Sequence, residues 1–259
     1  MAKKPIIVLK IGTSTLTQGT DTISIDKVSD ISDQISDLRE TYDIIIVSSG
    51  AIAAARQFNT HYRSQVKSGK APTNKSSLSA IGQPELMRIY NEAFMAVGLY
   101  GAQCLLTHYD FTGRKSRANT KKTILDLLKH DYIPIINEND TVAVEEIELG
   151  DNDQLSALVA VLVKATKLII ASDIDGIYTK NPKIHDDARL IKNVKSLEQV
   201  KKYVEDIDSD LGTGGMRTKI TAFEICTGYN IEVTIVNGSV KLFLDKVLND
   251  KIDRTTYRS

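Results

Sequence analysis

The 259-residue sequence lacks three features that would narrow its function at once. Its charges cancel, with 33 Lys and Arg against 33 Asp and Glu, so no global charge points to nucleic acid or to a membrane surface. Its longest mostly apolar stretch, residues 155–163, is far too short to span a bilayer. The N-terminus shows neither the apolar segment nor the cleavage site of a secretory signal. Any charge that binds an anion must therefore be local.

Cysteine and histidine are also scarce. Cys104 and Cys226 each lie inside an apolar run, which is typical of reduced core residues and favours a cytoplasmic protein. The four histidines are scattered and do not have the spacing of metal ligands. The sequence therefore predicts neither a disulfide framework nor a histidine metal site, and the ligands of any metal stay unassigned.

Short apolar runs alternate with helical patterns along the chain, and most of the runs are continuously apolar, as in strands buried on both faces. This alternation predicts an α/β fold, a three-layer sandwich around a mainly parallel sheet. The predicted strands are residues 6–9, 44–47, 103–107, 133–136, 168–171 and 232–236. The predicted helices are residues 25–42, 51–58, 84–97, 121–129, 153–165, 197–204 and 218–227. No linker separates independent domains, so we expect one domain, 1–259, with a softer division near Gly150 into two lobes that share the sheet.

The most informative segment is GTGGMRTK at residues 212–219. Its glycines let backbone N–H groups approach a ligand closely, and a Thr hydroxyl and a Lys ammonium follow where an apolar helical pattern begins. A helix N-terminus after such a turn is a good place to hold phosphate oxygens. The spacing is not that of a Walker A loop, and a plain glycine turn that caps a helix is the alternative interpretation.

In open α/β sheets, ligands bind at the loops that leave the carboxyl ends of the strands. Lys10 stands at the tip of the first predicted strand beside a glycine, where its ammonium could lie over a bound anion, or it could merely end the strand. Ser49 stands where a helix starts, which suits a carboxylate or a phosphate as well as ordinary capping. The four polar residues 137–140 (NEND) exceed what a cap needs, and their carboxylates could hold an ammonium group.

Two further loops complete this set. Residues 150–154 (GDNDQ) carry more acid than a helix cap requires, and an Asp there could orient lysines that would otherwise repel one another. Ser172 and Asp173 follow the strand 168–171 and could form the wall of a nucleotide site, although a turn built on Asp-Gly explains them equally well. The polar segment 63–77 is either a flap or regulator-binding loop or a solvated surface loop. We expect the basic run 114–122 to be a solvated helix entry.

With these motifs assembled, the sequence resembles the amino-acid kinase family. The resemblance rests on seven strings that occur in the family's order, namely VLKIGTSTLT (8–17), VSSGAIAAAR (47–56), AIGQPEL (80–86), IPIINENDTVA (133–143), GDNDQLSALVA (150–160), SDIDGIYTKNP (172–182) and GTGGMRTK (212–219). The NEND, GDNDQLSA and GTGGMRTK strings resemble those members that phosphorylate the γ-carboxylate of L-glutamate with ATP and Mg²⁺, at the first step of proline biosynthesis. The alternatives are a family member that acts on aspartate or N-acetylglutamate, or a nucleotide- or oxyanion-binding protein without catalysis.

The resemblance also implies roles for individual residues. Lys10 and Lys219 would contact the ATP phosphates and the migrating phosphoryl group, and Asp153 would organise the two lysines. Glutamate would be bound by Ser49, Asp140 and Asn152. The nucleotide would be bound by Lys10, Ser172, Asp173, Thr213, Gly214, Gly215, Met216, Arg217, Thr218 and Lys219. The lobe of residues 1–149 would then hold the acidic substrate, and the lobe of residues 150–259 would hold the nucleotide.

The resemblance carries expectations about partners as well. Relatives assemble through the kinase fold, so it implies a homo-oligomer, either a dimer or a tetramer. It also implies feedback inhibition by proline and transfer of the labile product to a glutamyl phosphate reductase, and neither nucleic acid nor a membrane is an expected partner. Many members carry an additional C-terminal PUA domain, whereas this sequence stops at Ser259, soon after the kinase motifs, so we expect a short form.

Overall fold

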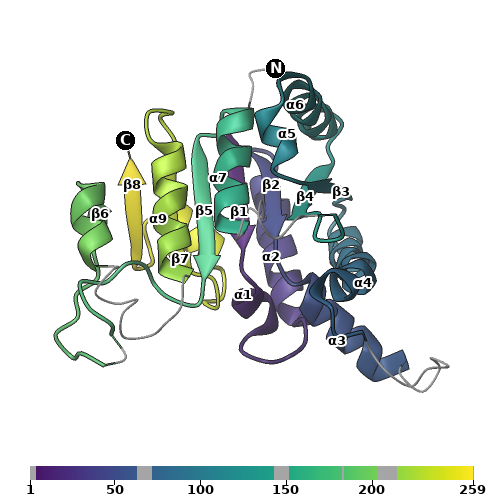
Figure 1. Ribbon diagram of the computed structural model, residues 1–259, viewed down its shortest axis with the longest axis horizontal. Coiled ribbons are helices and arrows are strands. Elements are labelled where there is room, and N and C mark those ends of the chain that lie inside the picture. The colour runs from purple at the N-terminus through teal and green to yellow at the C-terminus, as the bar shows by residue number, and fades with distance from the viewer. Residues whose placement is uncertain (1–3, 63–71, 143–151, 183, 204–214, 259) are drawn as a thin grey trace.

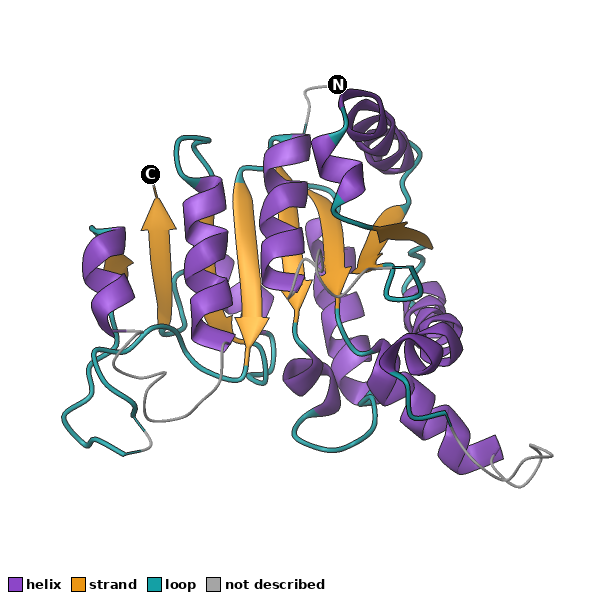
Figure 2. Cartoon of the chain, viewed as in Figure 1, coloured by secondary structure: helices purple, strands orange, loops and turns teal. Residues whose placement is uncertain are grey.

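The computed structural model describes residues 4–62, 72–142, 152–182, 184–203 and 215–258. These residues form an eight-stranded sheet that is covered by helices on both faces (Figures 1 and 2). The predicted three-layer α/β sandwich is therefore confirmed. Three segments lie outside the described residues, namely the glycine-rich residues before Gly215, residues 143–151 and most of the polar segment 63–77.

The sheet is mainly parallel and runs in the order β3-β4-β2-β1-β5-β7-β8-β6. Its strands are β1 (Ile6–Ile11), β2 (Asp43–Ser48), β3 (Gly101–Leu106), β4 (Ile133–Glu138), β5 (Lys167–Ser172), β6 (Asn193–Val194), β7 (Glu232–Asn237) and β8 (Arg254–Arg258). The pair β7 and β8 is antiparallel, and the other pairs are parallel. The strand β8, together with its parallel neighbour β6, thereby runs opposite to the other strands of the sheet; Figure 1 shows this for β8.

The order of the strands positions the site. The first four strands fill one half of the sheet, the last four fill the other, and β1 and β5 meet in the middle, where Lys10 pairs with Ile170. The chain thus continues outward in opposite directions from β1 and from β5. Ligands of open α/β sheets bind at such a switch of direction, outside the carboxyl ends of the strands.

Helices cover the two faces in separate groups. One face carries α5 (Tyr109–Thr112), α6 (Arg114–Lys129), α7 (Asn152–Val163), α9 (Gly215–Cys226) and the helical residues 197–203. The opposite face carries α1 (Thr13–Thr17), α2 (Ile25–Leu38), α3 (Ala51–Tyr62), α4 (Lys75–Ala96) and α10 (Phe243–Leu248). Figure 1 shows α7 and α9 lying side by side in front of the sheet.

Burial on both faces explains why the strands read as continuous apolar runs. In β1, Ile6 and Val8 pack into the cluster under α7 and α9, whereas Ile7, Leu9 and Ile11 pack into the cluster under α2 and α4. Successive side chains of a strand point to opposite faces, so a central strand of such a sandwich needs apolar residues at every position. The same alternation directs position 10 towards the face of α7.

Several element boundaries differ from the prediction. The helix α4 begins at Lys75, well before Pro84, because Asn74 caps it by accepting hydrogen bonds from the N–H groups of Ser76 and Ser77 at 2.8 and 3.3 Å. Pro84 lies inside this helix, where it removes one backbone donor. The helices α6 and α9 also start earlier than predicted, at Arg114 and Gly215. A cap outside the apolar pattern moves a helix start in a way that periodicity alone does not reveal.

Other elements were not predicted because they are short or polar. The strand β6 has two residues and α5 has four, which is too few to establish a period. The helices α1 and α10 and the strand β8 (RTTYR) were also missed. Cys226 is buried as expected, but Cys104 is only half-buried, because β3 is an edge strand of the sheet.

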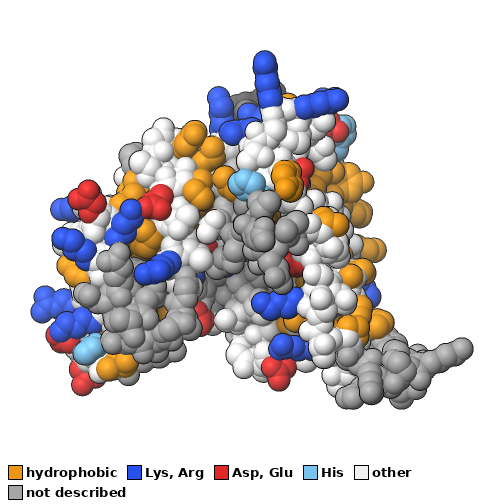
Figure 3. Space-filling view, in the orientation of Figure 1, with side chains coloured by type: hydrophobic (Ala, Val, Ile, Leu, Met, Phe, Trp, Pro, Cys, Tyr) orange, Lys and Arg blue, Asp and Glu red, His pale blue; other side chains and the backbone are white. Residues whose placement is uncertain are grey.

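The basic run 114–122 opens α6, and most of its Lys and Arg side chains are exposed, as predicted for a solvated helix entry. In the space-filling view, basic side chains project over α6 at the top of the molecule (Figure 3). Within the described ranges, no helix has both the length and the apolar character needed to cross a membrane.

Candidate active site

The loops singled out by the sequence meet at one edge of the sheet. The strands β1, β2, β4 and β5 are parallel, so their carboxyl ends share that edge. Backbone hydrogen bonds join the loops, since the Ser49 N–H donates to Ile11 O at 3.0 Å and the Gly12 N–H donates to Ala171 O at 3.2 Å. The predicted site residues at these strand ends therefore lie in one region.

A glycine shapes the loop that carries Ser49. Gly50 has a φ of 103°, in the region that side chains rarely adopt, and an added Cβ would lie 3.1 Å from both Leu16 and Ile23. Only glycine therefore makes this sharp turn from β2 into α3 without strain. The turn leaves Ser49 half-buried at the edge of the sheet.

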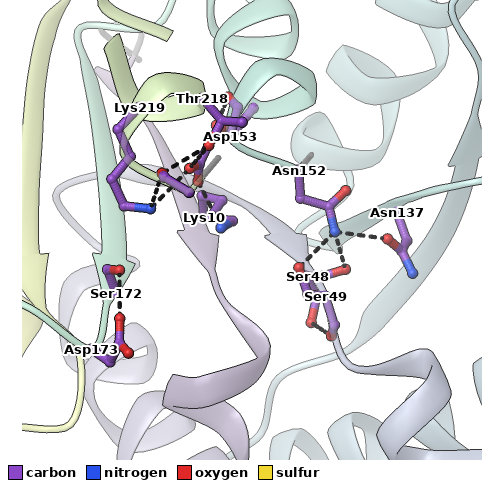
Figure 4. Close-up of polar contacts among 12 residues, drawn as sticks. Lys10, Ser48, Ser49, Asn137, Asn152, Asp153, Ser172, Asp173, Thr218 and Lys219 are labelled. Atoms are coloured by element: carbon purple, nitrogen blue, oxygen red, sulfur yellow. Dashed lines mark hydrogen bonds and ion pairs between the residues drawn. The ribbon is translucent and has the colours of Figure 1, made fainter. Parts of the chain in front are cut away.

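Two lysines and one aspartate form a buried ionic centre between the strands and helices (Figure 4). Lys10 Nζ lies 2.6 Å from Asp153 Oδ1, and Lys219 Nζ lies 3.1 Å from Asp153 Oδ2. The Thr218 hydroxyl donates to the same Oδ2 at 2.9 Å. The three charged side chains come from β1, α7 and α9, and Asp153 is fully buried while the lysines are 5% and 7% exposed. The sequence-predicted catalytic residues are thus brought together.

The charges of this centre decide its protonation state. Burial alone would raise the pKa of Asp153, but the ammonium groups of Lys10 and Lys219 and the Thr218 hydroxyl outweigh it and hold the pKa below its ordinary value. Asp153 is therefore ionised at neutral pH. Two positive charges then face one negative charge, which leaves a net positive site suited to a bound anion.

The first turn of α9 is fixed against this centre. The Gly215 carbonyl accepts hydrogen bonds from Thr218 Oγ1 at 3.0 Å and from Lys219 Nζ at 3.1 Å. Arg217 is exposed, whereas Met216 is half-buried and packs against the core. The helix thus points its N-terminus and one buried ammonium towards the same place, a favourable arrangement for phosphate. Thr213 and Gly214, also predicted to bind nucleotide, lie outside the described residues.

A polar cavity of about 430 Å³ lies beside the ionic centre. It is lined by Ser49, Asn137, Asp140 and Asn152, together with Glu138 and the cationic side chains of Arg56 and Lys75 on its outer side. The wall thus offers both carboxylates and cations, which suits a small zwitterion. All three residues predicted to bind the acidic substrate line this one cavity.

Hydrogen bonds order the floor of this cavity. Asn152 Nδ2 donates to Ser49 Oγ at 2.8 Å, to Asn137 Oδ1 at 3.0 Å and to the Ser48 carbonyl at 3.3 Å (Figure 4). At the other end, Ser79 Oγ donates to Asp140 Oδ2 at 2.6 Å. The loops after β2 and β4 and the start of α7 are thereby tied into one structure.

Ser172 and Asp173 lie on the opposite side of the ionic centre from this cavity. Ser172 ends β5 and donates from Oγ to Asp173 Oδ1 at 3.2 Å, and Asp173 is exposed (Figure 4). Their place beside Lys219 is compatible with a nucleotide wall. A larger cavity of about 570 Å³, between Lys192 and the turn 250–254, contains none of the predicted site residues and is lined mainly by exposed charged side chains.

Comparison with known proteins identifies the family. Residues 5–237 match the model of the amino acid kinase family. The chain belongs to the amino acid kinase family. It is 41% identical to a glutamate 5-kinase of Alkaliphilus oremlandii, over 99% of this chain and 97% of that relative. It is also 41% identical to a glutamate 5-kinase of Caldanaerobacter subterraneus, over 97% of this chain and 67% of that longer relative.

Solved structures of amino acid kinase folds agree with this assignment at the level of the fold. A carbamate kinase from Giardia lamblia bound to AMP-PNP superposes with a TM-score of 0.70 at 16% identity, and the match covers both chains completely. A UMP kinase from Ureaplasma parvum superposes with a TM-score of 0.68 at 18% identity, covering 99% of this chain and all of the other. The sheet and its two helical layers are thus shared across different substrates.

Two residues that support the cavity were not predicted from the sequence. Ser79 and Gln83 are buried on α4, 4% and 6% exposed, and contact Asp140 and Asn137 respectively. A signal was available, because residues four apart share one face of a helix and this face continues with the buried Leu86. Two polar residues on an otherwise apolar helix face indicate buried hydrogen bonds to a neighbouring element.

The chemistry of the site also bears on Mg²⁺, which the family resemblance implies. Each oxygen of the Asp153 carboxylate forms an ion pair with a lysine ammonium group, so this carboxylate is a poor candidate for a metal ligand. Across the part of the chain that the structure describes, no group of three or more His, Cys, Asp or Glu side chains could hold a metal ion. Mg²⁺ usually keeps several waters and binds through substrate phosphates, so the described residues fit a metal that arrives with ATP.

Proposed function

We propose that this chain transfers the γ-phosphoryl group of ATP to the γ-carboxylate of L-glutamate, as a glutamate 5-kinase at the first step of proline biosynthesis. The observation that carries the proposal is the ionic centre of Lys10, Asp153 and Lys219 beside the polar cavity. The two glutamate 5-kinases at 41% identity support glutamate as the substrate.

The reaction needs little acid–base chemistry. A free glutamate carboxyl has a pKa of about 4.3, so the γ-carboxylate is ionised at neutral pH and no general base is required. One carboxylate oxygen forms a bond to the γ-phosphorus while the bond from that phosphorus to the bridging oxygen of ADP breaks. The products are L-glutamyl 5-phosphate and ADP, and no proton changes place.

The task of the protein is therefore to position the two substrates and to neutralise the negative charge of the phosphate groups. Lys10 and Lys219 would bind the phosphate oxygens from two sides, and Asp153 would hold them apart in fixed positions despite their mutual repulsion. Backbone N–H groups at the start of α9, with Ser172 and Asp173, would bind the rest of the nucleotide. Mg²⁺ bound to the ATP phosphates would neutralise further charge on the transferring group.

The cavity would bind the amino-acid end of the substrate. Asp140 would pair with the α-ammonium group, Ser49 would donate to a carboxylate oxygen, and Asn152 would orient the chain of the substrate at the cavity wall. An N-acetylated substrate lacks that ammonium charge and would leave the carboxylate of Asp140 unpaired. The charge of the cavity wall therefore favours glutamate over N-acetylglutamate.

The deciding experiment measures ADP release from Mg-ATP while hydroxylamine traps the acyl phosphate as a hydroxamate. L-Glutamate, L-aspartate, N-acetylglutamate and no added acid run in parallel. We expect hydroxamate with glutamate alone. Hydroxamate with a different acid would keep the phosphoryl transfer and change the substrate. ATP binding without turnover of any acid would contradict the enzyme and favour a nucleotide-binding protein.

The chemistry of the product extends the proposal to a partner. An acyl phosphate is a labile mixed anhydride, so a glutamyl phosphate reductase that takes it directly would limit its loss to water. Inhibition by proline and assembly as a homo-oligomer belong to the same proposal. Light scattering of the purified chain, and the hydroxamate assay repeated with proline present, test these two points separately.

A further inference from the structure

A buried glutamine lies directly beneath the polar cavity. Gln83 is carried by α4, and its neighbour Gly82 lets α4 lie close to the first turn of α3, since an added Cβ at position 82 would stand 1.7 Å from the Ala51 carbonyl. The close approach brings the Gln83 side chain under β4. Gln83 is 6% exposed, and its amide oxygen accepts a hydrogen bond from Asn137.

Gln83 begins a chain of amide groups that leads to the cavity. Asn137 Nδ2 donates to Gln83 Oε1 at 2.9 Å, and Gln83 Nε2 donates to Gln103 Oε1 at 3.3 Å. Asn152 Nδ2 in turn donates to Asn137 Oδ1 at 3.0 Å and to Ser49 Oγ at 2.8 Å. The side-chain amides thus donate one to the next, from Asn152 to Asn137, from Asn137 to Gln83 and from Gln83 to Gln103 on β3.

The contacts of the Asn137 side-chain amide determine the direction in which the hydrogen-bonded amides donate. Asn137 Oδ1 also accepts from the Glu138 backbone N–H at 2.9 Å. If the Asn137 amide were flipped by about 180°, its NH₂ group would face two other donors, the Glu138 N–H and Asn152 Nδ2. Gln83 Oε1 satisfies the other side of the Asn137 amide. Ser49 Oγ accepts from Asn152, and among the described residues its hydroxyl proton has no hydrogen-bond acceptor, so the proton can be donated to a ligand.

We propose that Gln83 is a positioning residue for the amino-acid substrate, because it fixes the amide of Asn137 and, through Asn152, leaves the Ser49 hydroxyl as a donor to a substrate carboxylate. The inference rests on the proposed function, since that carboxylate belongs to glutamate. Gln83 lines neither the cavity nor the ionic centre, so it acts only through its neighbours. Its loss would weaken substrate binding and spare the phosphoryl transfer.

The test compares three variants with wild type in the hydroxamate assay. Gln83→Met keeps the length of the side chain and removes the acceptor, which leaves the buried Asn137 Nδ2 without its partner. The Asn137 amide then turns to find another partner and shifts the Asn152 amide that orients Ser49, so we expect the KM for glutamate to rise about 10- to 100-fold. The KM for ATP and the kcat at saturating glutamate should stay within about twofold, because the reacting groups are untouched.

Two matched variants separate a loss of substrate positioning from a general disturbance of the structure around Gln83. Gln83→Glu keeps an acceptor for Asn137 Nδ2 and can accept from a reoriented Gln103, so its KM for glutamate should lie much nearer wild type. Gln103→Met removes the exposed last amide of the series and leaves the contact between Gln83 and Asn137 in place. Its KM for glutamate should stay within about twofold of the wild-type value. Thermal unfolding confirms that each variant is folded, and Gln83→Leu carries the same expectation as Gln83→Met if the latter does not fold.

The outcomes distinguish this inference from the proposed function. A wild type that forms no hydroxamate with glutamate overturns both. An active wild type overturns the inference alone if folded Gln83→Met or Gln83→Leu keeps its KM for glutamate, or if the KM for ATP rises equally. A selective rise in the glutamate KM, with recovery in Gln83→Glu, supports the inference.

Discussion

The two ends of the site are built from different chemistry. At the phosphoryl end, Lys10, Asp153 and Lys219 form a buried charged cluster, whereas the substrate end has a floor of neutral amides and hydroxyls centred on Asn137 and Asn152. Charge attracts a phosphate from any direction and stabilises the charge that develops during transfer. Neutral amides recognise a ligand only through the direction in which they donate and accept.

One helix start serves both ends. Asn152 and Asp153 are consecutive in the first turn of α7, and their side chains contact the amide floor and the lysines respectively. Any shift of this turn would move both ends together, which keeps the bound amino acid in register with the phosphoryl group. The comparison therefore predicts that substitutions at the charged end lower kcat, whereas substitutions under the amide floor raise the KM for glutamate.

The largest effect is expected from Asp153→Asn. The substitution keeps the shape of the side chain but leaves Lys10 and Lys219 facing each other without the buried charge between them. Breaking a buried ion pair costs about 3–5 kcal/mol, and loss of lysine positioning should lower kcat by about 10³-fold or more. Urea unfolding and the hydroxamate assay measure the two effects.

A matched control is Asp187→Asn, which removes one partner of the exposed pair between Lys180 and Asp187. Both readouts should stay at the wild-type value there, because solvent screens such a pair. An Asp153→Asn protein with wild-type turnover would contradict the organising role of Asp153.

Lys219→Ala should have the next largest effect. Asp153 keeps Lys10 at 2.6 Å and the Thr218 hydroxyl at 2.9 Å, so we expect the variant to fold. Losing one preorganised donor to the transferring group should reduce kcat by about 10²–10³-fold. Steady-state kinetics with a circular dichroism melt measure turnover and folding together. Lys201→Ala, which removes an exposed lysine paired with Glu224, is the control and should not alter turnover.

The pH dependence of stability tests the charged end without any substrate. The lowered pKa of Asp153 means that its ionised form stabilises the folded state. This contribution is fully present above the unfolded pKa of about 3.9 and is lost as the pH falls through the lower folded pKa. We therefore expect the difference in unfolding free energy between wild type and Asp153→Asn to be constant from neutral pH down to about 5 and to narrow below about 4. A difference that narrows near neutral pH would mean a raised pKa instead.

The charged end could be foreseen from the sequence more fully than the amide floor. Lys10 ends an apolar run, and Asp153 and Lys219 open apolar helical patterns, so each stands at a strand end or helix start that periodicity locates. The parallel sheet then brings those positions to one edge. The sandwich and most of its strands followed from the same continuous apolar runs.

The support beneath the cavity depends on contacts that are distant along the chain. Ser79 meets Asp140 across 61 positions, and Asn137 meets Gln83 across 54. No local pattern encodes such a pairing, since it arises only when α4 packs against α3 and beneath β4. The start of α4 was missed for a related reason, because Pro84 looked like a first helical residue and lies inside the helix instead.

The smallest effect is expected from Ser79→Ala, at the amino end of the substrate cavity. Ser79 donates a 2.6 Å hydrogen bond to Asp140 Oδ2 and thereby holds the carboxylate that we propose for the α-ammonium group. Losing one such bond costs about 1 kcal/mol, so the KM for glutamate should rise about fivefold while kcat stays unchanged. Steady-state kinetics in both substrates measure this.

Ser77→Ala, an exposed serine on the same helix, is the control for that measurement and should keep the wild-type KM. If Ser79→Ala lowered kcat instead, a change beside the substrate cavity would also disturb the ionic centre. The division of the site into a part that binds glutamate and a part that transfers the phosphoryl group would then be wrong. If only the glutamate KM rises, Asp140 is held for recognition alone, and the relative activity towards N-acetylglutamate should rise with it, because that substrate has no ammonium for Asp140 to bind.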